Sequence, residues 1–220
     1  KLCQISYHYF VVLPNRIKID RLSVMRSCLT IIVLFLSFIS PPSWSADFDK
    51  GFAAAQSGDF ETALREWTPL AEQGSAQAQF NLAKMYREGK GVSKDYKTAV
   101  KWFNFSAKQG NAAAQYHLGV AYSYGLGVVP NYEVALKWYR RSAEQGNTFA
   151  QHHLSLLYYF GNGVTEDKVY AHMWANLAST NGFEMAKQLR QVLTEQMTHS
   201  QIDAALSLAR VCKDRNLNGC

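Results

Sequence analysis

The sequence repeats one short stretch three times, as YREGKGV at residues 86–92, YSYGLGV at 122–128 and YYFGNGV at 158–164. Each copy begins 36 residues after the one before it. A fixed period of roughly 20–50 residues is typical of proteins that are built from stacked structural repeats. The sequence therefore predicts three repeats, at residues 75–110, 111–146 and 147–182.

Each repeat is predicted to contain two helices joined by a glycine loop. In the first repeat Ala78, Leu82 and Tyr86 recur every four residues, which places them on one face of a helix. A Gly-x-Gly-Val loop then ends that helix, because glycine readily adopts the positive φ of a helix C-terminal cap. The second helix begins at Asp95, Asn131 or Asp167 as N-cap, and its apolar face carries an alanine and a tryptophan that we expect to lie between repeats. The repeated structural positions are Leu82, Tyr86, Gly89, Gly91, Ala99, Trp102, Gly110, Leu118, Tyr122, Gly125, Gly127, Ala135, Trp138, Gly146, Leu154, Tyr158, Gly161, Gly163, Ala171, Trp174 and Gly182.

Such a unit cannot bury its apolar face alone, so the units are expected to stack into an all-α solenoid. Residues 46–74 follow the same pattern in shorter form, with Pro69 inside the second helix, and are predicted to be a short N-terminal capping repeat. Residues 183–220 lose the glycine pattern and are predicted to form C-terminal capping helices.

The first 45 residues differ from the rest. Residues 25–45 begin at Met25 with Arg26, continue through the apolar run LTIIVLFLSFI, and end in small residues, which are the three parts of a secretory signal peptide. The run is too short to span a bilayer. Residues 1–24 are interpreted as an upstream extension outside the mature protein, with a genuine basic leader as the alternative. The predicted location is therefore periplasmic or secreted, and the mature form is predicted to have no stable membrane span.

Removing this leader changes the charge. The full chain has a formal net charge of 23 − 17 = +6, whereas residues 46–220 hold 18 basic and 16 acidic side chains, a net charge of +2. Because the two signs are interspersed, the sequence gives no support for nucleic-acid binding.

Only two cysteines, Cys212 and Cys220, follow the predicted signal peptide. Oxidising compartments preserve disulfides, so an exported chain is expected to join them. Closing so short a loop stabilises by roughly 2.5 kcal/mol in the chain-entropy description. The alternative is two unpaired thiols. A zinc site is not expected, because two thiolates do not complete a tetrahedral set of ligands.

The run Ala-Gln…Leu…Tyr…Gly-x-Gly-Val…Asp…Ala…Trp…Gln-Gly resembles the SEL-one-like repeat (SLR), a 36-residue relative of the tetratricopeptide repeat. Its opening pair is Ala78-Gln79 in the first repeat, and its closing pair is Gln109-Gly110. The resemblance implies a right-handed α-solenoid whose concave face binds proteins or peptides, often in the bacterial envelope. A secreted, cysteine-rich branch of the family is linked to penicillin binding and β-lactam hydrolysis. That branch carries a cysteine pair in each repeat, which this chain lacks, so the activity is not carried over.

No catalytic motif accompanies the repeats. The sequence contains no Gly-x-Ser-x-Gly elbow, Walker loop or His-Glu-x-x-His pair, and the glycine loops follow helices rather than strands. His117 and His153 occupy equivalent positions in adjacent repeats, but nothing supplies further ligands for a metal. We therefore expect no catalytic residues, no metal and no cofactor.

The first helices carry positions that vary between repeats while the predicted core stays fixed. Varying positions are free to specify a partner, and aromatic clusters are typical anchors at interfaces. The alternative is that Leu156 and Phe160 pack on the neighbouring repeat. The predicted partner-binding residues are Asn81, Lys84, His117, Val120, Tyr124, His153, Leu156, Tyr159 and Phe160.

The sequence therefore favours an exported, non-catalytic adaptor that binds a protein or peptide partner, with possible association with the cell envelope. Three alternatives remain open at this point: a hydrolase of the β-lactam-linked kind, a cell-wall glycan-binding module, and a cytoplasmic scaffold.

Overall fold

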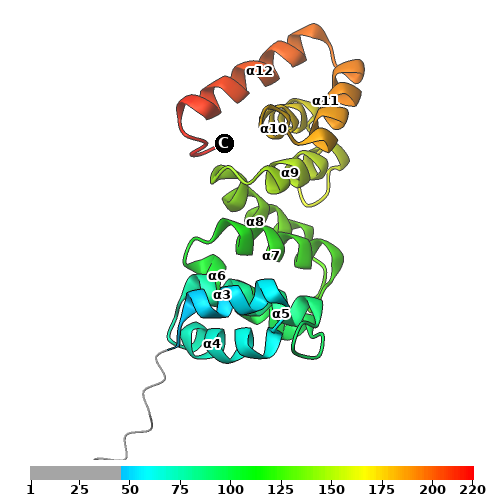
Figure 1. The fold of residues 1–220 in the computed structure, drawn as a ribbon. Coiled ribbons are helices and arrows are strands. Elements are labelled where there is room, and N and C mark those ends of the chain that lie inside the picture. Colours follow the sequence, from blue (N-terminus) through cyan, green and yellow to red (C-terminus); the bar gives the residue numbers. More distant parts are fainter. Residues whose placement is uncertain (1–45) are drawn as a thin grey trace, which may run out of the picture. The chain divides into compact units, whose positions relative to one another are not determined.

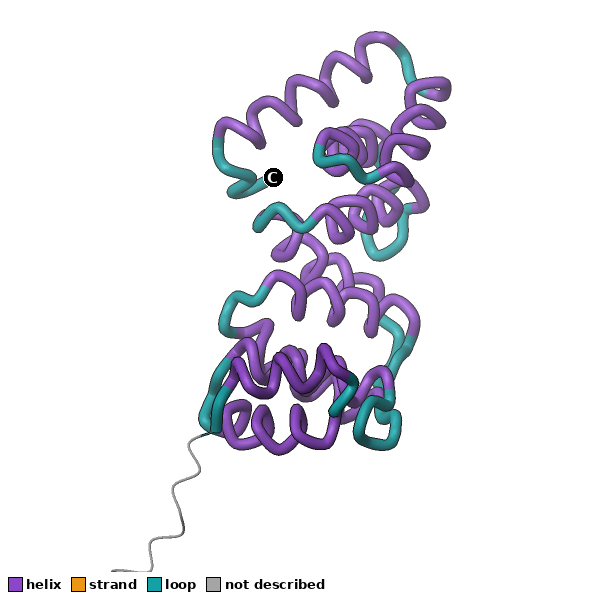
Figure 2. The backbone as a smooth tube through the Cα atoms, in the orientation of Figure 1, coloured by secondary structure: helices purple, strands orange, loops and turns teal. Residues whose placement is uncertain are grey.

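The computed structural model describes residues 46–220, which form ten helices and no strand (Figures 1 and 2). The predicted signal peptide and upstream extension lie outside the described residues. The helices are α3 (Phe48–Ser57), α4 (Phe60–Glu72), α5 (Ala76–Glu88), α6 (Tyr96–Lys108), α7 (Ala112–Tyr124), α8 (Tyr132–Glu144), α9 (Thr148–Phe160), α10 (Lys168–Thr180), α11 (Glu184–Gln196) and α12 (His199–Asp214).

The helices pack in pairs along the chain. Helix α5 packs against α6, α7 against α8, and α9 against α10, and each pair also contacts the next pair (Figure 1). The α3–α4 pair precedes this series, and α11 and α12 both pack on α10. The prediction of an all-α solenoid with a 36-residue period is confirmed.

The ends of the helices follow from local chemistry. Asp95 accepts hydrogen bonds from the backbone amides of Lys97 and Thr98, at 2.9 and 3.2 Å, and so caps the start of α6. Asn131 and Asp167 cap α8 and α10 in the same way. The first helix of each repeat ends at a left-handed glycine, and these glycines are Gly89, Gly125 and Gly161, with φ of 73°, 70° and 69°.

The second glycine of each loop lies against the preceding repeat. Gly127 has φ of 75°, and a Cβ added there would lie 2.5 Å from both the carbonyl carbon and the oxygen of Tyr96, in the first turn of α6. Gly163 meets Tyr132 in the first turn of α8 in the same way, again at 2.5 Å. Glycine is therefore required here both for its conformation and because another backbone passes so close.

The aromatic core differs from the sequence prediction. Trp102 and Trp138 are only partly buried, and the guanidinium of Arg141 lies 5.1 Å from the centre of the Trp138 ring. The next residue along each helix is the buried one: Phe103 is 2% exposed and Tyr139 is fully buried. Trp174, the equivalent residue of the third repeat, is fully buried on α10, the helix on which α11 and α12 pack.

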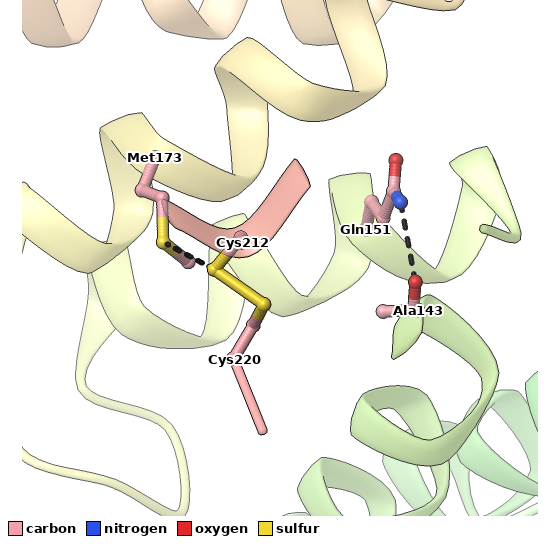
Figure 3. The surroundings of a disulfide bond; sticks show 5 residues. All are labelled: Ala143, Gln151, Met173, Cys212 and Cys220. Atoms are coloured by element: carbon pink, nitrogen blue, oxygen red, sulfur yellow. Dashed lines mark hydrogen bonds between the residues drawn. A yellow bond between two sulfur atoms is a disulfide. The ribbon is translucent and has the colours of Figure 1, made fainter. Parts of the chain in front are cut away.

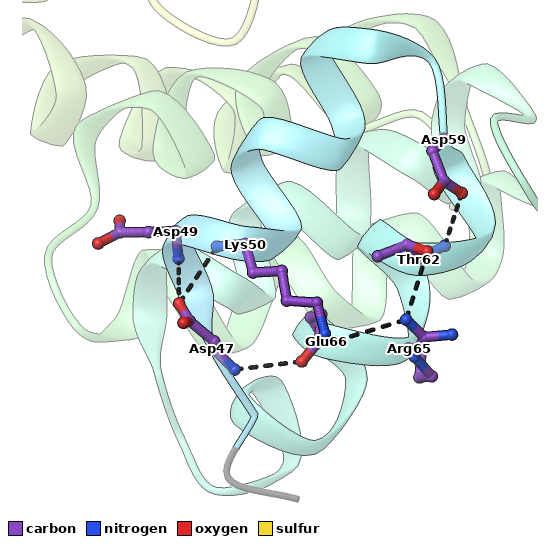
Figure 4. A network of polar contacts seen from close by, with 7 residues as sticks. All are labelled: Asp47, Asp49, Lys50, Asp59, Thr62, Arg65 and Glu66. Carbon is purple, nitrogen blue, oxygen red and sulfur yellow. Dashed lines mark hydrogen bonds and ion pairs between the residues drawn. The ribbon is translucent and has the colours of Figure 1, made fainter.

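The N-terminal pair is held by a polar network around the buried Glu66 (Figure 4). Its carboxylate lies 2.8 Å from Lys50 Nζ, and its other oxygen accepts a hydrogen bond of 3.2 Å from the amide of Asp47. These contacts lower the pKa of Glu66, with the Lys50 hydrogen bond as the largest cause. They tie the start of α3 to α4.

The C-terminal pair ends in a disulfide between Cys212 and Cys220, whose Cα atoms are 5.6 Å apart (Figure 3). Cys212 Sγ also lies 3.7 Å from Met173 Sδ on α10. A capping box of Thr198 and Gln201 begins α12. The bridge therefore fixes the last residues beside the third repeat.

Candidate interaction surface on the first helices

The predicted partner-binding residues lie on α5, α7 and α9, the first helices of the three repeats, and the structure divides them into two groups. Asn81, His117 and His153 occupy equivalent positions, and the two histidines contact aromatic rings of the preceding repeat. Asn81 is 8% exposed, and the two histidines are partly buried against aromatic rings. The second group extends toward the glycine loops and contains the exposed members, Tyr124 and Phe160.

The two histidines make the same contacts in successive interfaces. The ring of His117 lies 4.9 Å from that of Phe103 and 5.9 Å from that of Phe80, measured between centroids. The ring of His153 lies 5.1 Å from Tyr139 and 5.5 Å from Tyr116. Both histidine rings therefore pack between repeats. The two histidines shape the surface more than they offer free hydrogen-bonding groups to a partner.

The second group contains two strongly exposed aromatic side chains. Tyr124 is 65% exposed and Phe160 is 63% exposed, and they occupy equivalent positions at the ends of α7 and α9. The other members of this group are partly buried: Lys84 on α5, Val120 on α7, and Leu156 and Tyr159 on α9. Tyr159 also reaches the C-terminal pair, where its hydroxyl oxygen accepts a hydrogen bond of 3.2 Å from Gln196 Nε2.

The chemical character of this surface changes from repeat to repeat. The end of α5 is charged: Arg87 and Lys90 both pair with Glu88, the latter at 2.9 Å. At the positions of Arg87 and Glu88, α7 carries Ser123 and Tyr124, and α9 carries Tyr159 and Phe160. The surface is therefore ionic in the first repeat and aromatic in the third.

Burial keeps the histidines of these interfaces neutral. Burial, aided by the nearby Arg87 and Lys84 cations, lowers the pKa of His117 to about 3. Arg87 Nη1 lies 2.9 Å from His117 Nδ1, a contact that needs an unprotonated ring nitrogen as acceptor. Burial also lowers the pKa of His152 to about 4, and it lowers the pKa of His153 and His172.

These lowered pKa values predict loss of stability in weak acid. The unfolded chain protonates its histidines near pH 6.5, whereas the folded chain keeps them neutral, so the free energy of unfolding falls as the pH drops below about 6.5. For His117 the fall continues until the pH reaches its folded pKa of about 3. We expect a loss of about 2–3 kcal/mol between pH 7 and pH 5, measured by urea unfolding at each pH. The variant His117→Phe should show a smaller loss, and equal stability of the unmodified chain at both values would contradict the prediction.

Sequence reasoning missed a chain of glutamine contacts that links the repeats. Gln79 Nε2 donates to the carbonyl of Ala71 at 3.0 Å, and Gln79 Oε1 accepts from Gln109 Nε2 at 2.8 Å. Gln115 repeats this arrangement one repeat later. The Ala-Gln and Gln-Gly pairs were visible in the sequence, but their mutual contact depends on the spatial pairing of the two helices.

Within residues 46–220, no three His, Cys, Asp or Glu side chains are grouped so that they could hold a metal ion. None of the helices from α3 to α12 has the length and apolar character needed to cross a membrane.

Comparison with known proteins agrees with this architecture. The family model described as Sel1 repeat matches residues 76–111, 112–147 and 148–183. A Sel1 repeat protein from Oxalobacter formigenes has a crystal structure with 30% sequence identity and a TM-score of 0.61, over 64% of this chain and 58% of that one. A protective antigen present in uropathogenic Escherichia coli strains, which displays an SLR fold, has 28% identity and a TM-score of 0.55, over 77% of this chain and 46% of that one.

No curated protein matches the sequence. This chain spans little more than half of the first of these two solved structures and less than half of the second.

Proposed function

This chain belongs to the Sel1 repeat family, whose members typically serve as scaffolds for protein interactions, and on that premise we propose that it is an exported, non-catalytic adaptor that binds a protein or peptide on the surface of its first helices. The observation that carries the proposal is the pair of exposed aromatic side chains, Tyr124 and Phe160, at equivalent positions of adjacent repeats.

Exposed aromatic rings at repeated positions favour a binding role. Core positions of the same helices, such as Leu118 and Leu154, are 1% and 0% exposed, so Tyr124 and Phe160 are not needed to bury the repeats. Large aromatic side chains supply much of the free energy at protein interfaces, because they bury a large area with few rotatable bonds. The partner is therefore expected to present apolar side chains to α7 and α9.

The charged first repeat adds a second requirement on the partner. Lys84 makes no ion pair among residues 46–220, although its ammonium lies 5.7 Å from the centre of the Phe80 ring. A carboxylate on the partner would gain a favourable contact at this point. We therefore propose a partner segment with apolar residues at one end and an acidic residue toward α5.

The disulfide between Cys212 and Cys220 supports export, because reducing compartments keep cysteines in the reduced, unpaired form. The predicted signal peptide at residues 25–45 agrees with this proposal. The setting in which to seek the partner is accordingly the cell envelope.

A crosslinking pull-down from an envelope fraction tests the proposal, with the chain as bait. The double variant Tyr124→Ser/Phe160→Ser is expected to lose a discrete protein that the unmodified chain captures, with at least a tenfold drop in yield if each ring contributes about 1 kcal/mol. The matched control is Phe105→Ser, which removes an aromatic ring that is 42% exposed on α6, a second helix. Equal capture by all three proteins would contradict the proposal, as would an equal loss in the control.

A further inference from the structure

The chain of glutamine contacts described above stops at the third repeat. Gln151 still donates from Nε2 to the carbonyl of Ala143, at 3.2 Å, as Gln79 and Gln115 do to Ala71 and Ala107 (Figure 3). The residue that should donate to its Oε1 is Asn181, which is one methylene shorter than Gln109 and Gln145. Gln151 Oε1 accordingly has no hydrogen-bond donor among residues 46–220.

This missing bond is costly where it occurs. Gln151 is fully buried, and its Oε1 is covered. A buried acceptor without a donor loses its bonds to water and gains nothing in return, which costs about 1–3 kcal/mol. The two earlier repeats avoid this cost with bonds of 2.8 and 2.7 Å. The third repeat therefore lacks one amide N–H donor at a defined point.

An open pocket of about 390 Å³ lies at the same place. It is formed between the end of α8, the helices α9 and α10, and the loop that the disulfide holds after α12. Its wall includes both Gln151 and Asn181, and Leu177 and Leu217 supply apolar surface. Asn181 is exposed, so its side chain can turn away from Gln151 without breaking a hydrogen bond to another of residues 46–220.

The charged groups of the pocket balance. Glu144 and Lys213 both line it, and neither makes an ion pair with another residue of the described chain. One carboxylate and one ammonium leave the pocket with no net charge. The remaining polar lining residues, Gln145, Gln151, Asn181 and Asn216, are neutral amides. Such a lining favours a neutral polar group over a carboxylate or an ammonium.

We propose that this pocket binds the side-chain carboxamide of a glutamine presented by a peptide. The peptide's amide N–H takes the place that Gln109 and Gln145 fill in the first two repeats, donating to Gln151 Oε1 once Asn181 turns aside. Its methylene groups pack on Leu177 and Leu217, and its carbonyl accepts from an amide of the lining. The site includes neither Tyr124 nor Phe160, so it stands whether or not the first-helix surface binds a partner.

A nuclear magnetic resonance titration tests the proposal. The probe is the blocked tripeptide acetyl-Gly-Gln-Gly-methylamide, and the matched peptide has glutamate in place of glutamine. The glutamine peptide is expected to shift the side-chain NH2 signals of Gln151 with a dissociation constant in the millimolar range, as befits so small a ligand. The glutamate peptide should bind at least tenfold more weakly.

Two variants of the chain complete the test. Asn181→Gln supplies the missing donor from within, so it should abolish the peptide-induced shifts while raising the melting temperature. Asn218→Gln makes the same chemical change at an exposed residue outside the lining and should leave the titration unaltered. Shifts that persist in Asn181→Gln, equal binding of the two peptides, or no response to the glutamine peptide would each overturn the proposal.

Discussion

Replacing Tyr139 with alanine is expected to lower the free energy of unfolding by about 3–5 kcal/mol, the usual cost of removing a large aromatic ring from a core. Tyr139 is fully buried between α7 and α9, with its ring 6.0 Å from Tyr116 and 5.1 Å from His153. A Cβ on Gly119 would lie only 2.5 Å from that ring, so the backbone of α7 is packed directly against it. Neighbouring groups cannot easily collapse into the space that the ring leaves.

Trp138→Ala provides the matched comparison. It removes a larger side chain from the adjacent position, but Trp138 is only partly buried and contacts Arg141 at the surface. Its cost should be about 1–2 kcal/mol, in line with the smaller apolar area that it removes from contact. Urea unfolding of both variants measures the difference. A Trp138 variant that is less stable than the Tyr139 variant would show that the core is packed on the tryptophan.

Replacing Gly127 with alanine is expected to cost about 2–5 kcal/mol, the sum of a conformational and a steric contribution. An alanine held at φ of 75° loses about 1–2 kcal/mol relative to glycine. The new methyl would also meet the backbone of Tyr96 and Lys97 at 2.5 and 2.6 Å, and forcing apart two packed segments costs about 1–3 kcal/mol more. The substitution lies where the loop of the second repeat contacts α6 of the first repeat.

Gly110→Ala separates these two sources. Gly110 also has positive φ, of 93°, but no atom lies within 4 Å of an added Cβ. This variant should show the conformational cost alone, about 1–2 kcal/mol. Thermal or urea unfolding of the pair measures the steric contribution by subtraction. If the two variants lose the same stability, the close approach of the loop to α6 does not contribute.

The period and the loops were predictable from sequence because each depends on local chemistry. A left-handed glycine such as Gly125 and an N-cap such as Asp95 satisfy the backbone of their own helix, whatever packs around them. The contact of Gly127 with Tyr96 was not predictable in this way, since it joins residues 31 positions apart along the chain. The Gly-x-Gly-Val motif contains both the glycine that caps the helix and the glycine that contacts the preceding repeat, and the motif alone does not distinguish their roles.

The buried aromatic position was missed because its partner lies on another helix. Fully buried Tyr139 packs on Gly119, whereas in the third repeat Ala175 and Ser155 occupy the equivalent positions. In the second repeat the large Tyr139 is thus paired with glycine, the smallest residue. In the third repeat both residues of the pair, Ala175 and Ser155, are small. Ser155 compensates further by donating to the carbonyl of Ala171 at 2.6 Å. These departures from the repeat are coupled, and only their proximity in space shows it.

The candidate surface was predictable only in part. Variation between repeats placed the predicted partner-binding residues on α5, α7 and α9. It does not separate a residue that faces solvent from one that packs on a neighbouring repeat. His117 and His153 pack against rings of the preceding repeat, Phe103 and Tyr139 respectively. Tyr124 and Phe160 stay exposed, and their role in binding remains the prediction that the pull-down tests.

The packing of each helix pair on its immediate neighbours has a mechanical consequence. Force applied to α3 and α12 passes through the joints in turn, because the extensive helix contacts within residues 46–220 lie inside a pair or between adjacent pairs. A small rotation at each joint adds to the next, so the stack stretches and recoils in the manner of a spring rather than moving as a rigid block. Where such a chain holds a partner across several joints, the bound segment also sets the length of the spring.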